Sequence, residues 1–304
     1  MNEPALQGMA HTHLDRKAPL LRPGNTNCGG CGMSIVLNML SRGIGDRRVQ
    51  LVIPACCGIV TAGPFPCSAY GAPVVAATFA SAAAFATGMA RAAQMNGEPT
   101  RVICFAGDGG TYDIGMATLS AAAERNEDLL YICYDNEIYG NTGGQRSSAT
   151  PLGARTSTTP TGKEQPKKDI LAIMAAHGIP FATSVSLAHP EDALRKLREA
   201  VGLGGFRFVH VLSPCPTGWK SEPADGIELV RLAVRSGLYP ILTVRDGHRA
   251  AIDIEPDFDK EALGEYFARQ RRFRAEDVDL EHITTAIRTT WERLRRQCAG
   301  GDGP

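Results

Sequence analysis

The chain has 304 residues and 43% hydrophobic content, which suffices for a sizeable core in one large domain or two ordinary ones. Its 32 Lys and Arg residues equal its 32 Asp and Glu residues, so no overall charge favours nucleic acid or an anionic membrane as a partner. The N-terminus lacks a long apolar segment, so we expect a soluble, cytoplasmic protein that binds neither nucleic acid nor a membrane.

Short runs of β-branched and other apolar residues alternate with stretches of helical periodicity. This alternation is typical of crossover units, so we expect an α/β fold with a mostly parallel sheet flanked by helices. The expected strands lie at 50–54, 101–106, 129–134, 180–185 and 207–212. The expected helices lie at 33–42, 72–95, 113–126, 167–178 and 189–202.

Two segments break this alternation. Residues 139–168 are rich in Gly, Ser, Thr and Pro, and this stretch is too long for an ordinary connection, which indicates a functional loop. After about residue 240 the chain becomes charged and helical, ending in a Gly-rich tail. We therefore expect a domain over 1–240 and a helical C-terminal arm over 241–304.

Gly107, Asp108, Gly109 and Gly110 directly follow the expected strand 101–106 and precede a helix. Ligands of open α/β sheets bind at the carboxyl edge of the strands. Glycines let the backbone approach a phosphate, and a following helix offers free N–H groups. Because Asp108 can face a phosphate only through a cation, the pattern predicts a divalent metal such as Mg²⁺.

The next expected strand ends at Asn136 and Ile138, which bring a side-chain amide and a loop carbonyl to the same edge. A lone Gly-Asp-Gly is more often a tight turn. Here an asparagine follows it after 26 intervening residues, and this pair resembles the thiamine diphosphate signature. By that resemblance Asp108 and Asn136 are side-chain Mg²⁺ ligands, and the Ile138 carbonyl is a third.

Nine cysteines in a chain without a secretion signal favour reduced thiols or metal ligands over a disulfide framework. Two of them form a C-x-x-C pair near the N-terminus, and the others of interest follow expected strands. The C-x-x-C pair alone fits zinc, a redox pair or half of an iron–sulfur site. The candidate ligands are Cys28, Cys31, Cys56, Cys57 and Cys215.

Four segments, CGGCG, GDGGTYDIG, YGNTGGQRSSATPLGARTSTTPTGK and PCPTGW, together resemble the β subunit of the pyruvate (2-oxoacid):ferredoxin oxidoreductases of the multi-subunit type. The resemblance runs in order from about Pro23 to about Arg272. It implies a thiamine diphosphate-binding fold, a proximal [4Fe–4S] cluster, and CoA-dependent oxidative decarboxylation of a 2-oxoacid to acyl-CoA and CO₂.

The resemblance also implies the cluster ligands, which are Cys28, Cys31, Cys215 and one cysteine of the pair at 56 and 57. Alignment of the residues that follow the pair favours Cys57. The segment CGIVTAGPFP begins at Cys57, and it then matches in length the family's segment that follows the third cysteine. The distance from Cys31 would instead select Cys56.

Asn141, in the GNTGG turn, is implied to lie near the diphosphate and thiazolium, where its amide polarises the substrate. The implied cofactor-binding residues are Cys57, Gly107, Asp108, Gly109, Gly110, Asn136, Ile138, Gly140, Asn141 and Thr142. In the family a glutamate of the α subunit contacts the aminopyrimidine ring, and we find no match here. We therefore expect an obligate complex with α, γ and ferredoxin-like δ subunits or their fused equivalents, and ferredoxin or another electron acceptor.

Two departures from the family leave pyruvate, branched-chain and aromatic 2-oxoacids open as substrates. Residues 66–70 replace an aromatic stretch, and Met33 stands where single-chain members carry a glutamate. A non-oxidative thiamine diphosphate-dependent decarboxylase or carboligase with a structural metal site is the alternative, and a zinc-stabilised binding module is a third hypothesis. Iron analysis separates them, because only the oxidoreductase needs four converging cysteines for electron transfer.

Overall fold

The computed structural model describes residues 19–64 and 66–299. At its centre is a sheet of eight strands with the order β2-β1-β3-β4-β6-β5-β7-β8. Neighbouring strands from β2 to β5 are parallel, whereas β7 and β8 are antiparallel to their neighbours. The strands are β1 Arg48–Pro54, β2 Val74–Ala77, β3 Thr100–Gly107, β4 Leu129–Asp135, β5 Phe181–Ser186, β6 Phe206–Leu212, β7 Ile241–Arg245 and β8 Arg249–Ile254. The expected mostly parallel sheet is confirmed.

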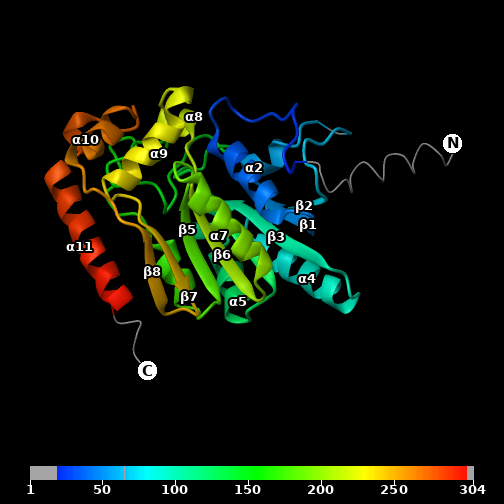
Figure 1. Cartoon of the computed structure of the whole chain (residues 1–304). Coiled ribbons are helices and arrows are strands. Elements are labelled where there is room, and N and C mark those ends of the chain that lie inside the picture. The colour runs from blue at the N-terminus through cyan, green and yellow to red at the C-terminus, as the bar shows by residue number, and fades with distance from the viewer. Residues whose placement is uncertain (1–18, 65, 300–304) are drawn as a thin grey trace.

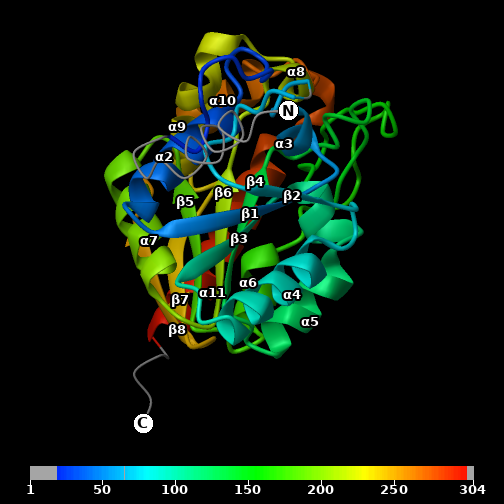
Figure 2. The same ribbon diagram turned by 90° about the vertical axis from the view of Figure 1, so that its right-hand side faces the viewer.

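Helices cover both faces of this sheet (Figures 1 and 2). They are α2 Gly32–Ile44, α3 Cys57–Val60, α4 Ala82–Met95, α5 Met116–Glu124, α6 Ile170–Ala175, α7 Pro190–Gly202, α8 Pro216–Trp219, α9 Gly226–Arg235, α10 Lys260–Ala268 and α11 Leu280–Ala299. The apolar sides of α4, α5 and α6 pack on one face, and those of α2 and α7 pack on the other. A third apolar cluster joins α9, α10 and α11.

The carboxyl ends of the parallel strands meet at one edge of the sheet. Gly107 at the end of β3 pairs with Tyr134, and Asp135 at the end of β4 pairs with Leu212 at the end of β6. The loops that leave this edge carry the Gly-Asp-Gly segment, Asn136 and three of the candidate cysteines. Parallel strand order therefore brings the predicted ligands together from distant parts of the sequence.

Three strands lie where the sequence analysis expected helices. Residues 74–77, inside the expected helix 72–95, form β2. Residues 241–254, expected to begin a helical arm, form β7 and β8 and extend the sheet, so the helical expectation is wrong for this stretch. The rest of the expected arm is largely helical, in α10 and α11. The N-terminal segment before residue 19 and the Gly-rich tail from residue 300 lie outside the described residues.

The long loop 139–168 is confirmed, since it contains no helix or strand and has only two isolated β-bridges, Tyr139 with Gln145 and Thr156 with Thr159. Its last part folds around the buried side chain of Lys163. The Lys163 ammonium donates to three main-chain carbonyls, at 3.1 Å for Ser148, 3.4 Å for Pro166 and a short contact for Thr150. The loop is thus ordered by a buried cation in place of regular secondary structure.

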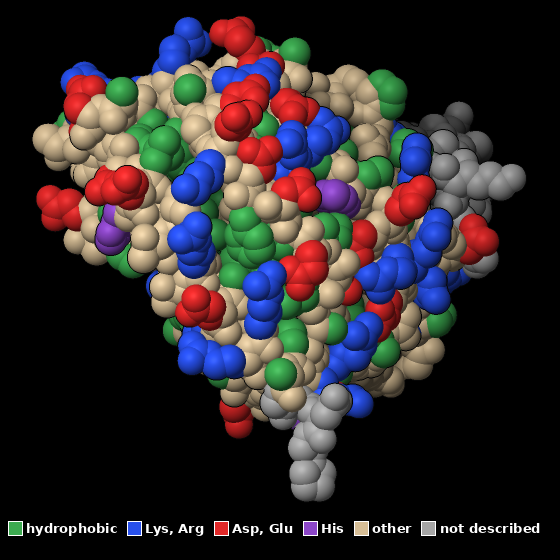
Figure 3. All heavy atoms as spheres, turned by 60° about the vertical axis from the view of Figure 1, so that its left-hand side comes forward, with side chains coloured by type: hydrophobic (Ala, Val, Ile, Leu, Met, Phe, Trp, Pro, Cys, Tyr) green, Lys and Arg blue, Asp and Glu red, His purple; other side chains and the backbone are tan. Residues whose placement is uncertain are grey.

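The side of the molecule that carries α10 and α11 is charged, with Lys, Arg, Asp and Glu side chains interspersed over it (Figure 3). One such pair joins Arg295 to Glu255 at 2.9 Å, with both side chains about half exposed. Exposed pairs contribute little to stability, so packing holds this helix. Its buried side chains are Ile287, Trp291 and Leu294. Within the described residues, no helix has the length and apolar character needed to span a bilayer.

Candidate cofactor and metal site

Asp108 and Asn136 lie side by side at the carboxyl ends of β3 and β4, and both are buried. The Asn136 amide, oriented so that its nitrogen donates, bridges Asp108 Oδ1 at 2.8 Å and the Ile138 carbonyl oxygen at 2.7 Å. The other Asp108 oxygen accepts from Ser147 Oγ. If the Asn136 amide is flipped, its oxygen lies next to the Asp108 carboxylate oxygen and the Ile138 carbonyl oxygen. Carboxylate, amide and carbonyl oxygens are the ligands that Mg²⁺ takes. The predicted ligand set therefore converges and fits this ion.

The Asp108 carboxylate has hydrogen-bond donors but no ion pair within the described part of the chain. Burial, and then the neighbouring carboxylate of Asp135, raise the pKa of Asp108 well above its usual value. Ser147 and Lys167 act in the opposite direction but are outweighed. A divalent cation would reverse this balance, because it supplies the counter-charge that the protein does not.

A buried charged network lies directly behind these ligands. Asp135 Oδ2 contacts Lys167 Nζ at 2.6 Å and His210 Nε2 at 2.8 Å, and it accepts from Tyr112 Oη at 2.7 Å. Lys167 also contacts Glu137 Oε1 at 2.9 Å. Burial alone would raise the pKa of Asp135, but Lys167 and His210 hold it below its usual value. Burial likewise opposes the Lys167 charge, but Asp135 and Glu137 raise the pKa of Lys167.

The glycines after Asp108 are packed closely rather than exposed. Gly109 and Gly110 belong to a buried π-helical turn over 109–113. A Cβ on Gly109 would lie 2.1 Å from the Tyr139 ring, so any other residue would displace that ring. Tyr139 in turn contacts Phe79 edge to face, with 5.8 Å between ring centroids. In this structure these glycines seat an aromatic pair, and their contact with a phosphate remains a prediction.

Asn141 and Thr142 are exposed at the tip of the turn that follows β4. Positive φ angles at Gly143 (117°) and Gly144 (77°) let the chain reverse there. Gln145 Nε2 donates to the Thr142 carbonyl at 2.7 Å and closes the turn. The turn therefore leaves both side chains exposed, and their contact with a cofactor remains a prediction.

The N-terminal loop with Cys28 and Cys31 packs against the loop after β6, which carries Cys215. The Gly32 N–H donates to the Pro214 carbonyl at 2.9 Å. A Cβ on Gly32 would lie 2.4 Å from the Pro214 ring, so glycine is required for this approach. The approach at Gly32 of the CGGCG segment thus brings the loop with Cys28 and Cys31 to the loop with Cys215, far away in the sequence.

Cys56 and Cys57 point in different directions from the start of α3. Cys56 Sγ accepts a hydrogen bond from Tyr134 Oη at 2.9 Å, on the core side. A Cβ built on Gly140 would lie 3.7 Å from Cys57 Sγ and 3.9 Å from Cys215 Sγ. Cys57 therefore faces the other candidate ligands, whereas Cys56 faces the core. This geometry favours Cys57 over Cys56 as the cluster ligand that joins Cys28, Cys31 and Cys215.

The thiols influence one another's ionisation. Burial, followed by the four neighbouring thiols, raises the pKa of Cys57 to about 12, and burial raises the pKa of Cys215 to about 11. Binding of a metal cluster would reverse this, because it displaces the thiol protons. No group of three or more His, Cys, Asp or Glu side chains in residues 19–64 and 66–299 is already arranged to hold a metal ion. The candidate thiols fit a cluster by their chemistry, and two of them, Cys57 and Cys215, lie beside Gly140.

Comparison with known proteins identifies the family. The family model for the thiamine pyrophosphate enzyme C-terminal TPP-binding domain matches residues 60–211. Pyruvate synthase subunit PorB of Methanothermobacter thermautotrophicus is 41% identical over 260 residues, covering 84% of this chain and 89% of that protein. Ketoisovalerate oxidoreductase subunit VorB of Pyrococcus abyssi is 40% identical over 285 residues, covering 90% and 91%. The chain belongs to the β-subunit family of the 2-oxoacid:ferredoxin oxidoreductases.

A solved structure, 2-oxoglutarate:ferredoxin oxidoreductase from Magnetococcus marinus, matches with a TM-score of 0.57 at 22% identity, covering 69% of this chain and 79% of that chain. At this identity the likeness shows the fold alone. Together with the family model it confirms the predicted thiamine diphosphate-binding fold. The Mg²⁺ ligands, the cluster ligands and the role of Asn141 remain predictions for this β subunit.

Packing explains part of the two departures from the family pattern. Met33 is buried in the core on the α2 side of the sheet. Tyr70 is also buried, and its hydroxyl donates to the Gly58 carbonyl at 2.6 Å. Residues 66–68 are exposed. The buried Met33 and Tyr70 therefore give no basis for choosing among 2-oxoacids.

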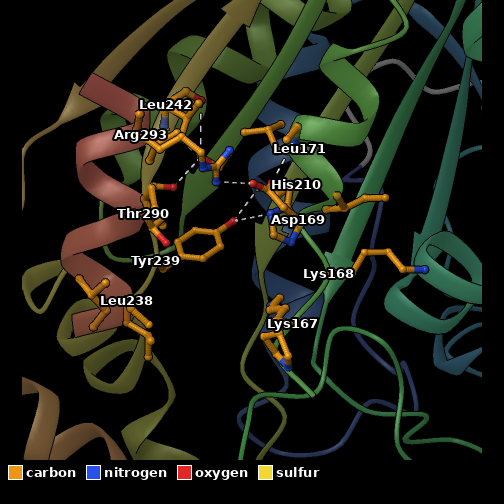
Figure 4. Close-up of a pocket in the computed structure, with 18 of the residues that line it drawn as sticks. Lys167, Lys168, Asp169, Leu171, His210, Leu238, Tyr239, Leu242, Thr290 and Arg293 are labelled. Carbon is orange, nitrogen blue, oxygen red and sulfur yellow. Dashed lines mark hydrogen bonds and ion pairs between the residues drawn. The ribbon is translucent and has the colours of Figure 1, made fainter. Parts of the chain in front are cut away.

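A separate cavity of about 1030 Å³ lies between α6, α11 and the sheet (Figure 4). Most of its lining is aliphatic. Tyr239 Oη lies 3.2 Å from His210 Nδ1 on one side, and Arg293 from α11 contacts Asp169 at 2.9 Å on another. The cavity shares Tyr112, Glu137, Lys167 and His210 with the charged network, but none of the predicted metal ligands or cysteines lines it. It therefore adjoins the candidate cofactor site through the charged network.

The sequence analysis missed the supporting side chains of this β subunit. Ser147 and Lys167 were seen only as members of a polar loop, and Arg272 only as part of a charged segment. Lys167 lies 30 residues and Arg272 lies 135 residues from their shared partner Glu137. The charge of Glu137 beside Asn136 was the available signal, since a charge that follows a buried strand requires a partner.

Proposed function

We propose that this chain supplies the Mg²⁺–thiamine diphosphate half-site and the proximal [4Fe–4S] ligands of a CoA-dependent 2-oxoacid:ferredoxin oxidoreductase. The reaction converts a 2-oxoacid and CoA to acyl-CoA and CO₂, and two electrons pass singly to ferredoxin or another acceptor. The proposed substrate is a 2-oxoacid with an aliphatic side chain, because the relatives are subunits of a pyruvate synthase and a ketoisovalerate oxidoreductase.

The observation that carries the proposal is that the proposed Mg²⁺ site and the proposed cluster site meet at Gly140. A Cβ built there would lie 3.7 Å from the Asn136 amide and from Cys57 Sγ, and 3.9 Å from Cys215 Sγ. Because glycine has no side chain, it leaves the space between these groups free. The proposed metal ligands and the proposed cluster ligands are therefore neighbours, as transfer of electrons from one cofactor to the other requires.

In this proposal Asp108, Asn136 and the Ile138 carbonyl hold Mg²⁺, which binds the diphosphate to the edge of the sheet. The network around Asp135 keeps the turn that carries two of these ligands in place. The residues proposed to border the cofactor are Gly107, Gly109, Gly110, Gly140, Asn141 and Thr142. The proposed cluster ligands are Cys28, Cys31, Cys57 and Cys215.

When bound, thiamine diphosphate supplies the nucleophilic carbon and the electron sink for decarboxylation, and the cluster supplies one-electron acceptance. Asn141 is proposed to orient the substrate carbonyl with its exposed amide. The glutamate that contacts the aminopyrimidine ring is proposed to come from an α subunit. Further γ and ferredoxin-like δ subunits, or fused equivalents, complete the proposed complex.

Anaerobic purification of the chain, by itself for metal analysis and with its partner subunits for turnover, tests the proposal. In the isolated chain we expect about four iron atoms and a broad absorption band near ~400 nm, and in the complex we expect thiamine diphosphate binding that depends on Mg²⁺. Zinc in place of iron would overturn the cluster assignment, because Zn²⁺ has no redox chemistry. Decarboxylation without dye reduction would favour the non-oxidative decarboxylase or carboligase instead.

A further inference from the structure

Arg272 is an almost fully buried arginine, and its side chain has three kinds of contact between α10 and the edge of the sheet. Its Nη2 contacts Glu137 Oε2 at 2.6 Å, and its Nε donates to Gln270 Oε1 at 2.9 Å. Its guanidinium stacks on the Trp219 ring at 4.6 Å from the centroid. Arg272 therefore joins segments that are far apart in the sequence.

The contact with Glu137 stabilises the 135–138 turn, which carries two of the proposed Mg²⁺ ligands. Glu137 lies between Asn136 and Ile138, and its φ of 64° is in the left-handed region that residues with a Cβ rarely adopt. Such a conformation persists only where the surroundings hold it. Arg272 and Lys167 hold its carboxylate from two sides, at 2.6 and 2.9 Å. These two cations thereby fix the direction of the two proposed metal ligands beside Glu137.

The contact with Trp219 stabilises the loop that carries Cys215. Trp219 ends α8, the short helix that follows Cys215, and its indole N–H donates to the Asn136 carbonyl at 2.8 Å. The Trp219 main-chain N–H also donates to the Cys215 carbonyl at 2.7 Å, so the stacked guanidinium lies one residue contact away from the Cys215 loop. One side chain thus contacts the turn of the metal ligands and the helix that follows a cluster ligand.

One nitrogen of this guanidinium, Nη1, is buried and has no hydrogen-bond partner within the described part of the chain. An unpaired buried donor on a charged group is costly, and native structures rarely leave one without a reason. Packing alone would be served equally well by an uncharged side chain of similar size. The orphan donor points to a role for Arg272 beyond packing.

We propose that Arg272 is a positioning residue shared by the proposed Mg²⁺ site and the proposed cluster site. It fixes the 135–138 turn through Glu137, and it supplies a buried positive charge beside the Cys215 loop. The inference rests on the proposed function. The affinity for Mg²⁺–thiamine diphosphate and the reduction potential of the cluster then both depend on the Arg272 side chain. Partners outside the ligand shell of a metal commonly contribute about 10- to 100-fold to its affinity.

The test compares Arg272→Gln and Arg272→Lys in the anaerobically purified complex, with Arg274→Gln as the matched control. Arg274 is two positions away, and its side chain is 59% exposed. We expect Arg272→Gln to weaken Mg²⁺-dependent thiamine diphosphate binding about tenfold or more by calorimetry. It should also shift the cluster potential to more negative values, because a nearby positive charge favours the reduced cluster. Arg272→Lys should restore the potential but not the full affinity, because lysine lacks the planar fork.

The double variant Glu137→Gln with Arg272→Gln guards against a simple folding defect. In Arg272→Gln the buried Glu137 carboxylate keeps Lys167 but loses its second cation. Removing the Glu137 charge as well relieves this loss, so thermal stability should recover while the potential stays shifted. Recovery of both affinity and potential in this variant would overturn the inference, and so would wild-type values in Arg272→Gln. A wild-type complex that binds neither iron nor thiamine diphosphate would instead contradict the proposed function.

Discussion

Asp108 is the one side chain in the proposed Mg²⁺ ligand set that can carry a negative charge. We predict that Asp108→Ala lowers Mg²⁺-dependent affinity for thiamine diphosphate by more than about 100-fold, since even partners outside the ligand shell contribute up to that much. The iron content should stay unchanged, because the thiols lie on other loops. Calorimetric titration of the purified complex measures the affinity. Asp246→Ala, an exposed carboxylate on the β7–β8 turn, is the control, and equal affinity in the two variants would refute the metal assignment.

Cys56 and Cys57 offer a comparison between neighbours in the sequence. We predict that Cys57→Ser loses or degrades the cluster, because Cys57 faces Cys215 across Gly140. Cys56→Ser should keep about four iron atoms per chain, because its sulfur contacts Tyr134 in the core. Iron analysis and the visible spectrum of both variants decide the matter. A full cluster in Cys57→Ser would show that the third ligand is Cys56.

At the scale of single residues, the sequence predicts ligands better than it predicts their supports. Asp108 and Asn136 could be paired because each directly follows a strand, and the ends of parallel strands meet. The hydrogen bond from Ser147 and the cations Lys167 and Arg272 depend on how distant loops fold back. Sequence order alone does not specify such contacts.

At the scale of elements, the missed strands have identifiable causes. The short strand β2 lies beside an alanine-rich run, whose composition is typical of helix. The β7–β8 hairpin turns at Asp246 and Gly247, which both have positive φ, at 50° and 75°. An Asp-Gly pair between apolar runs is a strong hairpin signal, so this hairpin was predictable. The charged residues that follow it favoured the helical interpretation instead.

The loop 139–168 depends on one buried cation, and this gives a prediction. Lys163→Met should lower stability by about 1–3 kcal/mol, because three carbonyls lose their shared donor. Hydrogen exchange should increase over residues 148–166. Thermal unfolding and exchange mass spectrometry measure both effects, with the exposed Lys260→Met as control. Unchanged protection in the loop would mean that the lysine does not organise it.

At the scale of the whole molecule, the proposed function gives this chain one half of a catalytic centre. The proposed metal ligands and the proposed cluster ligands Cys57 and Cys215 lie near Gly140 at one edge of the sheet, and the GNTGG turn leaves Asn141 and Thr142 exposed. The relatives are named as subunits, which fits a site completed by another chain.

We therefore predict that the isolated chain, reconstituted with thiamine diphosphate, Mg²⁺ and cluster, is catalytically inactive. The proposed function takes the glutamate for the aminopyrimidine ring from an α subunit, and without it the reactive form of the cofactor is not promoted. Decarboxylation of pyruvate and of 2-ketoisovalerate, coupled to reduction of a viologen dye, measures the activity. The co-expressed complex is the positive control, and cofactor binding by the isolated chain shows that the half-site is intact. Comparable rates for the isolated chain and the complex would place the missing acid in these 304 residues and contradict the division of labour.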